Sequence, residues 1–257
     1  PEDMESARPQ VTGVVVRELS RHASNWRSTR GLDEWLAEAG IPVIEGVDTR
    51  RLTRHLRERG AMRGVVAEGR QPSAELTSRL LGSPSMEGLD LATVASVKTP
   101  WSEGDGPHIV AYDYGIKRNI VRMLVGAGCK VTVVPAETGA EEVGLLNPDG
   151  LFLSNGPGDP AAVEYAIQTI RDLSGGGLPT FGICLGHQLV GLAFGGRTEK
   201  LPYGHRGGNH PVKDLRTGQV LITTQNHGFA VVGDAEGVPG APGLEVTHLN
   251  LNDGTIE

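Results

Sequence analysis

Short apolar runs alternate with segments of helical periodicity from His108 onward. The runs that predict strands are 109–112, 131–134, 151–153 and 180–183. Between them, apolar residues recur at helical spacing in 117–127 and 161–173. This alternation is typical of an α/β fold with a mainly parallel sheet flanked by helices. Beyond Gly196 the pattern changes, and it predicts short antiparallel strands at 220–224, 229–232 and 244–248.

The first hundred residues predict a smaller α/β domain that precedes this sheet. The apolar runs 11–16 and 64–67 predict two strands. Apolar residues at helical spacing predict a helix over 32–39, behind the capping candidates Ser28 and Thr29. A second helix is expected to begin near Asp48 or Thr49 and to end at Gly60.

The periodicity fades between Ser83 and Gly106, where serine, glycine, proline and aspartate accumulate. Such a composition favours a connecting segment over a packed element. We therefore expect an N-terminal domain over residues 1–100, a linker over 101–107 and a second domain over 108–257.

Composition narrows the class of protein. No apolar run approaches the roughly 18 to 20 residues that cross a bilayer, and residues 1–5 lack the basic and apolar regions of a signal peptide. The two cysteines, Cys129 and Cys184, are too few for a disulfide framework. We expect a cytoplasmic protein with no membrane partner, in which Cys129 is a packing residue.

The net charge of −7 argues against a nucleic-acid partner. Residues 1–100 are electrically balanced, so the negative charge lies in residues 101–257. A protein that binds nucleic acid usually presents a basic face. The arginines between Arg50 and Arg63 are the local exception, and we expect them to be solvated or ion-paired, with contact to a partner subunit as the alternative.

The candidate chemistry centres on Cys184. The spacing Gly182-x-Cys184-x-Gly186 has the form of a nucleophile elbow, with sulfur in place of the serine hydroxyl. Such an elbow is a tight strand-to-helix turn that strains the nucleophile and leaves no room for neighbouring side chains. A helix that begins at Leu185 would also direct its N–H groups at the sulfur, which favours the thiolate.

A second loop follows the expected strand 151–153. Residues 154–160, Ser-Asn-Gly-Pro-Gly-Asp-Pro, place two glycines between prolines directly before a helix. In an open α/β sheet, ligands bind beyond the carboxyl ends of the strands, where both this loop and the elbow are expected. Backbone amides there suit a developing oxyanion, and we expect the donors to be the N–H groups of Gly158 and Leu185.

A thiol nucleophile usually needs a histidine base, itself oriented by a carboxylate or an amide. His187 lies on the same helix as the thiol and is expected to be held in packing. His205 and His210 fall in a glycine-rich loop, and His227 falls in a polar turn. None has a carboxylate nearby in sequence, so the residues alone leave the base open.

These motifs resemble a known family. Residues 182–188 and 154–160 are similar to class I, triad-type glutamine amidotransferases. Four further stretches resemble the small, glutaminase subunits of carbamoyl phosphate synthetases, and they are 46–53, 112–120, 204–211 and 225–231. The resemblance runs over nearly the whole chain, and its motifs occur in the family's order.

The resemblance implies a reaction and a set of site residues. Cys184 would attack the side-chain amide of glutamine, form a γ-glutamyl thioester and release ammonia, with the oxyanion between the amides of Gly158 and Leu185. The glutamine would be held by Gly156, Gly158, Leu185, Gln188, Asn226, Gly228 and Phe229.

The resemblance also implies a partner. Ammonia would pass through a tunnel to a large synthetase subunit, which makes carbamoyl phosphate from it with bicarbonate and ATP. That product would serve pyrimidine and arginine biosynthesis. The small subunit itself would need no metal, no nucleotide and no other cofactor, because ATP, magnesium and bicarbonate are used by the large subunit.

The sequence departs from the family pattern in two ways. The family's catalytic histidine and glutamate lie in a His-Pro-Glu motif, and no such motif occurs in residues 1–257. The family's first segment, upstream of Pro1, is also missing. We therefore expect a fragment that lacks both ends and that has lost most glutamine hydrolysis, since a thiol without its base keeps only binding and oxyanion contributions. His227 is the first substitute base to test.

Two other functions are considered. The chain could be the glutaminase component of another biosynthetic pathway, such as anthranilate or GMP synthesis, but that reading predicts no dedicated N-terminal domain. It could also be a non-catalytic docking subunit that binds and regulates a synthetase. A reactive Cys184 would distinguish the enzymes from the docking subunit.

Overall fold

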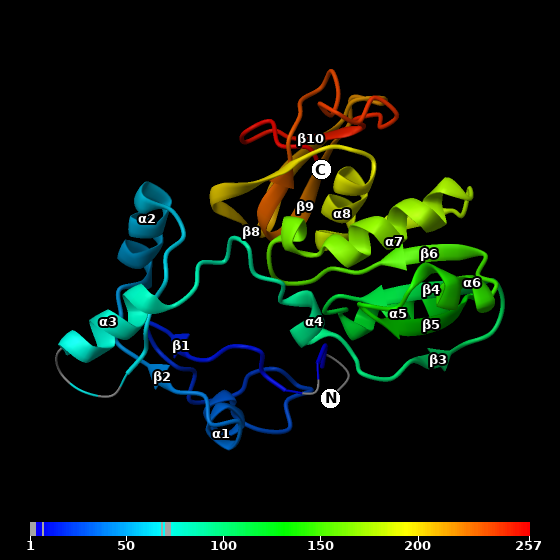
Figure 1. The fold of residues 1–257 in the computed structure, drawn as a ribbon. Helices are drawn as coiled ribbons and strands as arrows, with labels where there is room; N and C mark the ends of the chain where they lie inside the picture. The colour runs from blue at the N-terminus through cyan, green and yellow to red at the C-terminus, as the bar shows by residue number, and fades with distance from the viewer. Residues whose placement is uncertain (1–3, 7, 68, 70–72) are drawn as a thin grey trace. The chain divides into compact units, whose positions relative to one another are not determined.

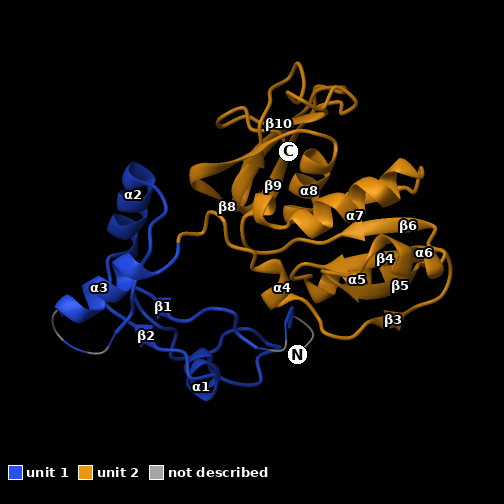
Figure 2. Ribbon diagram, viewed as in Figure 1, with its two compact units in different colours: residues 1–84 blue, residues 85–257 orange. Residues whose placement is uncertain are grey.

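The computed structural model describes residues 4–6, 8–67, 69 and 73–257 (Figure 1). They form two compact units, residues 1–84 and 85–257 (Figure 2). Most of the N-terminal segment 1–5 lies outside the described residues. The division falls earlier than the expected linker at 101–107, because residues 101–103 form a sheet strand of the second unit. Its serine and glutamate, which suggest a linker, occupy exposed positions of that strand.

The first unit combines short strands with helices. Strand β1 (Val14–Val15) pairs in parallel with β2 (Val43–Ile44). The helices are α1 (Leu32–Glu38), α2 (Thr49–Arg59) and α3 (Ala74–Gly82). The expected start and end of α2 are confirmed, since the Arg51 N–H donates to Asp48 at 3.0 Å and Gly60 follows with a φ of 84°.

Three details of the first unit differ from the sequence pattern. Segment 64–67 forms no strand. Helix α1 begins after Gly31 rather than at Ser28 or Thr29. Helix α3 was not predicted; its N-terminus is capped by Ser73, whose hydroxyl accepts the Leu76 N–H at 3.1 Å.

The second unit, every residue of which is described, contains the predicted parallel sheet. Its strands are ordered β3-β5-β4-β6-β7. Strand β3 (Trp101–Glu103) is antiparallel to β5 (Lys130–Pro135), whereas β4 (His108–Asp113), β6 (Gly150–Leu153) and β7 (Thr180–Gly182) continue the sheet in parallel. The mainly parallel α/β fold is therefore confirmed. The carboxyl ends of these parallel strands lie at one edge, as a ligand-binding crevice requires.

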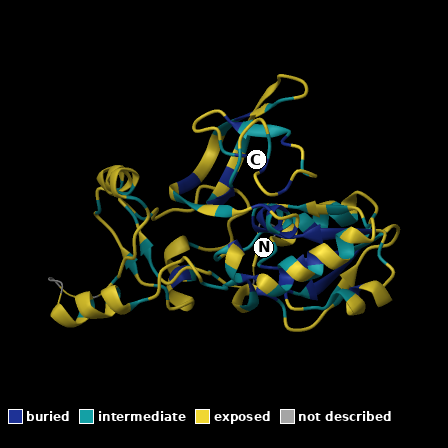
Figure 3. Cartoon of the chain, turned by 45° about the horizontal axis from the view of Figure 1, so that its top comes forward, coloured by how far each residue is buried: buried dark blue, intermediate teal, exposed yellow. Residues whose placement is uncertain are grey.

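Helices cover both faces of this sheet, whose central strands are buried (Figure 3). On one face, Tyr112, Leu153 and their neighbours pack against α6 (Ala140–Leu145), α7 (Glu164–Gly175) and α8 (Leu185–Ala193). On the other face, Val131 and Val133 pack against α5 (Arg118–Gly126). The short helices α4 (Ala92–Ala95) and η1 (Pro160–Ala162) lie in the connections. Burial of these apolar side chains fixes the sheet that carries the elbow.

A second, antiparallel sheet follows α8. It has the order β10-β8-β9, with β8 (Thr198–Asp214), β9 (Val220–Val231) and β10 (His248–Asn250). The two strands expected at 220–224 and 229–232 are one continuous strand, because the polar residues between them continue the ladder with β8. The strand expected at 244–248 is displaced toward the C-terminus.

None of the helices in the described part of the chain combines the length and the apolar composition that crossing a membrane requires.

Candidate active site

Cys184 lies in the tight turn between β7 and α8, as the elbow pattern predicts. Its backbone has φ 54° and ψ −107°, and α8 begins at Leu185. Among the described residues other than glycine, only Cys184 and Asn147 have positive φ. A non-glycine residue in such a conformation stores about 1–3 kcal/mol of strain, which persists only where the surrounding structure enforces it. This strained turn places the thiol at the carboxyl end of strand β7.

The two flanking glycines are required by close backbone contacts. A Cβ at Gly182 would lie 2.5 Å from the carbonyl carbon of Gly186. A Cβ at Gly186 would clash with the carbonyl oxygen of Leu153 in the neighbouring strand β6. The Gly-x-Cys-x-Gly spacing therefore allows α8 to begin directly against the sheet.

The sulfur of Cys184 lies among backbone groups from three segments. Its thiol donates to the carbonyl oxygen of Asn226 on β9, at 3.9 Å. The backbone N–H groups of Leu185 and Gly156 hydrogen-bond to the sulfur and lower its pKa, as do the charges of Lys117 and Arg206. Burial is the larger effect, and it raises the pKa of the thiol above its ordinary value. The expected thiolate-stabilising contribution of the helix is therefore present but outweighed.

The loop of residues 154–160 is held rigidly beside the elbow. Ser154 Oγ accepts the Tyr114 N–H at 2.9 Å, and Asp159 accepts the N–H groups of Gly88 and Ala161, each at 2.9 Å. Gly158 has a φ of 100°, and a Cβ there would lie 2.7 Å from the Leu89 carbonyl oxygen. This loop can therefore present backbone N–H groups in fixed positions.

The structure directs the Gly156 N–H, together with that of Leu185, at the sulfur. Gly158 lies in the same loop, and within the described residues its N–H has no protein acceptor. The role of Gly158 as an oxyanion donor stays a prediction.

Three of the predicted glutamine-binding residues, Gly156, Leu185 and Asn226, have backbone groups next to the thiol. Gln188, on the first turns of α8, is buried, and its Nε2 donates to the Phe229 carbonyl oxygen at 2.6 Å. This bond ties α8 to β9 at the segment that carries Asn226 and Gly228. The Gln188 side chain thus supports the wall of the site, and its contact with glutamine stays a prediction.

Among the described interactions, no imidazole nitrogen contacts the Cys184 sulfur. His227 is occupied elsewhere: its Nδ1 lies 2.8 Å from the Phe229 carbonyl oxygen and its Nε2 lies 3.1 Å from Gln225 Oε1. Burial lowers the pKa of His227 and also that of His187. The structure therefore identifies no base for Cys184 among these histidines.

Two cations near the thiol were not found from the sequence. Lys117 precedes α5, and Arg206 lies on β8 opposite Asn226 of β9. Only the strand register shows that Arg206 reaches the site, because no local motif marks it. Both charges favour an anion at this end of the sheet.

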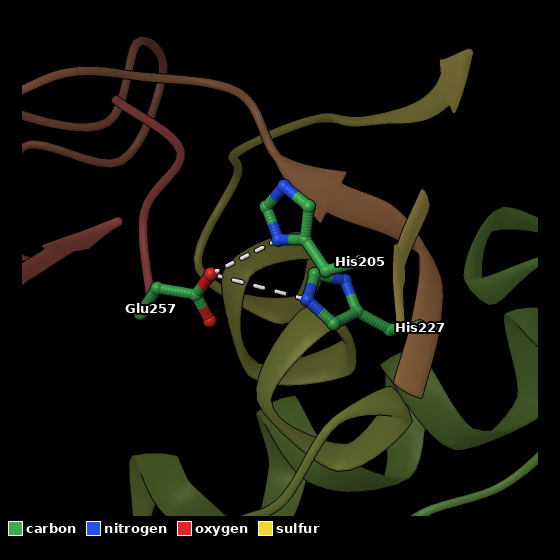
Figure 4. A group of neighbouring side chains, drawn as sticks. All are labelled: His205, His227 and Glu257. Carbon is green, nitrogen blue, oxygen red and sulfur yellow. Dashed lines mark ion pairs between the residues drawn. The ribbon is translucent and has the colours of Figure 1, made fainter. Parts of the chain in front are cut away.

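A group of possible metal ligands lies on the antiparallel sheet (Figure 4). It contains His205 on β8, His227 on β9 and Glu257. No histidine of this group had a carboxylate close in sequence, so only the fold could bring the three residues together.

The sequence matches two family models. The model described as glutamine amidotransferase class-I matches residues 110–257. The model of the CPSase domain of the carbamoyl-phosphate synthase small chain matches residues 1–66. The two matches thus account for both the elbow domain and the N-terminal part.

Curated relatives match over the entire chain. The carbamoyl phosphate synthase small chain of Syntrophotalea carbinolica is 48% identical over 273 residues, covering 100% of this chain and 71% of the relative. Those of Pseudomonas putida and Chlorobaculum tepidum are 50% and 51% identical, and the matches cover 100% of this chain and 72% and 70% of the relatives. The chain belongs to the carbamoyl phosphate synthase small chain family, with a class I glutamine amidotransferase domain.

Proposed function

We propose that the protein cleaves the side-chain amide of glutamine with Cys184 as the nucleophile. The thiol gives up its proton and its sulfur attacks the amide carbon; the carbon–nitrogen bond breaks, and the nitrogen takes up that proton and leaves as ammonia. The resulting γ-glutamyl thioester is hydrolysed by water to glutamate and free thiol. The strained position of Cys184 at the head of α8 supports this role.

The proposed oxyanion donors are the N–H groups of Gly158 and Leu185. Gly156, Gln188, Asn226, Gly228 and Phe229 complete the proposed glutamine site. The rigid loop 154–160 and the bond from Gln188 to Phe229 support this assignment, since both hold backbone groups next to the sulfur.

We further propose that the ammonia passes to a large synthetase subunit, where ATP, magnesium and bicarbonate are used to make carbamoyl phosphate. The relatives are named carbamoyl phosphate synthase small chains, which supports transfer of ammonia to a larger partner chain. The thiol chemistry itself uses no cofactor in this proposal. The protein would act in the cytoplasm, in pyrimidine and arginine biosynthesis.

The observation that carries the proposal is the positive φ of Cys184, together with the hydrogen bond from its thiol to the Asn226 carbonyl oxygen. It is tested by labelling with an electrophilic glutamine analogue and locating the adduct by peptide mass spectrometry. We expect one adduct per chain at Cys184, slower labelling in the presence of glutamine, and no adduct in Cys184→Ala. Cys129, in the same chain, is an internal control that should stay unmodified.

A folded protein that is not labelled at Cys184 would contradict the proposal and favour the non-catalytic docking subunit. Labelling that glutamine does not slow would contradict the glutamine site, since it would show a reactive thiol without glutamine recognition.

A further inference from the structure

His205 and His227 lie opposite each other on adjacent strands. They are register partners of β8 and β9, and their rings are 4.8 Å apart between centroids. The side chain of Glu257 approaches both rings, with its Oε1 atom 3.3 Å from His205 Nδ1 and 3.9 Å from His227 Nε2 (Figure 4). Gln225 Oε1 completes the group, at 2.9 Å from His205 Nδ1 and 3.1 Å from His227 Nε2.

The partners of the outer ring nitrogens indicate where the imidazole protons lie. His205 Nε2 is 2.7 Å from Asp253 Oδ2, and His227 Nδ1 is 2.8 Å from the Phe229 carbonyl oxygen. Both partners are acceptors, so these nitrogens carry the protons. In two neutral rings, the other two nitrogens, His205 Nδ1 and His227 Nε2, would then carry lone pairs and act as acceptors.

The centre of the group is therefore rich in acceptors and poor in donors. Two imidazole lone pairs face the oxygens of Gln225 and Glu257. Among the described residues, the side-chain donor at this centre is Asn250 Nδ2, at 3.1 Å from Glu257 Oε1, 3.3 Å from Gln225 Oε1 and 3.4 Å from His205 Nδ1. One amide cannot satisfy four acceptors, whereas a cation at their centre would.

We propose that His205 Nδ1, His227 Nε2 and Glu257 Oε1 bind a divalent metal ion of the zinc class, with Gln225 Oε1 or water as a fourth ligand. Zinc binds imidazole nitrogen and carboxylate oxygen at about 2.0–2.2 Å, so tetrahedral ligands lie about 3.3–3.5 Å apart. The four separations of 2.9, 3.1, 3.3 and 3.9 Å span this value. The ligand atoms of His205, His227 and Glu257 all lie within 4.8 Å of one another, so the widest pair would close by up to about 1.3 Å to enclose an ion.

The surrounding contacts have the form that metal sites use. Metal-binding histidines usually donate their second ring nitrogen to a carboxylate or a backbone carbonyl group. Asp253 has the first role toward His205, and the Phe229 carbonyl group has the second toward His227. Asn250, which is 1% exposed, orients the Glu257 carboxylate. These contacts would preorganise the ligands before an ion binds.

The ion would stabilise β9 without entering the reaction at Cys184. His227 lies between Asn226 and Gly228, so a metal bond at its ring would hold this segment against β8. The family resemblance implies a small subunit that needs no metal, and this proposed site departs from that expectation. The site is independent of the proposed reaction.

Cobalt(II) titration of the Cys184→Ala protein tests the site, since cobalt(II) replaces zinc and its visible absorption reports low coordination numbers. The substitution removes the elbow thiol as a competing ligand. We expect saturation at one ion per chain, strong visible bands and their loss on addition of zinc. His205→Asn should abolish the bands, and Asp253→Asn should weaken binding by about 10–100-fold.

His55→Asn, on the exposed surface of α2, is the matched control and should bind cobalt(II) normally. If His205→Asn fails to fold, Glu257→Gln and Asp253→Asn replace it, because both side chains are partly exposed. A spectrum like that of aqueous cobalt(II) would overturn the proposal and favour a protonated histidine paired with Asp253 and Glu257. Full binding in both replacement variants would overturn it as well.

Discussion

The reactivity of Cys184 depends on a balance between burial and nearby charge. Burial raises the pKa of its thiol, whereas the backbone N–H groups and the cations Lys117 and Arg206 lower it. Only the thiolate attacks an amide carbon, so each positive group enlarges the reactive fraction at neutral pH.

Arg206→Gln should slow thiolate formation. Loss of a positive charge raises the pKa of Cys184 further, so the pH midpoint of its alkylation by iodoacetamide should move upward. The shift should shrink in high salt, because Arg206 is exposed. Arg197→Gln, an exposed arginine just before β8, is the control. An unchanged midpoint in Arg206→Gln at low ionic strength would disprove the assigned charge effect.

At the scale of elements, the elbow depends on how closely α8 approaches β6. Gly186→Ala should destabilise the protein by about 1–3 kcal/mol, because the added methyl group meets the backbone of Leu153 and must displace the helix. Cys184 labelling should fall in parallel, since the helix carries the sulfur. Urea denaturation measures the first effect and peptide mass spectrometry the second.

Gly126→Ala is the matched control for this helix-glycine substitution. A Cβ at Gly126, in α5, meets no atom within 4 Å, so the change should be neutral or stabilising by up to about 1 kcal/mol. Equal stability of the Gly186→Ala and Gly126→Ala proteins would contradict the close approach of α8 to the sheet.

Local patterns predicted the elements that bury apolar side chains regularly. Strands β4 to β7, helices α2, α5 and α8 and the strained turn at Cys184 followed from periodicity and glycine spacing. Segment 64–67 was wrong as a strand, because an apolar run needs a paired neighbour to become one. Strand β3 was assigned to a linker, because its edge position leaves polar residues exposed.

Residues brought together by strand register could not be predicted. Arg206 reaches Cys184 and His205 meets Glu257 only because β8 and β9 pair as they do. Neither pair is close in sequence. Resemblance to a family, in contrast, predicted the residues next to the thiol, because those residues form contiguous motifs.

At the scale of the whole molecule, buried histidines should make the stability depend on pH. Burial lowers the pKa of His187 and of His227, so the unfolded chain binds protons that these folded imidazoles exclude. Their contribution is full above the unfolded value of about 6.5 and is lost as the pH falls through the lower folded values. Stability should therefore decrease on acidification.

Urea denaturation at pH 7.5 and 5.5 measures this effect, and the free energy of unfolding should be lower at pH 5.5. His187→Asn should reduce the difference between the two pH values. An equal difference in the variant and the original protein would contradict the role of His187.

The central claim is that Cys184 becomes acylated by glutamine. Incubation with saturating glutamine, followed by acid quenching and peptide mass spectrometry over a time course, tests it most directly. We predict a glutamyl adduct that forms slowly on Cys184, because the described histidines supply no base, that hydroxylamine removes and that Cys184→Ala lacks. A Cys184 that stays unmodified throughout, or a glutamyl adduct on another residue, would contradict the account.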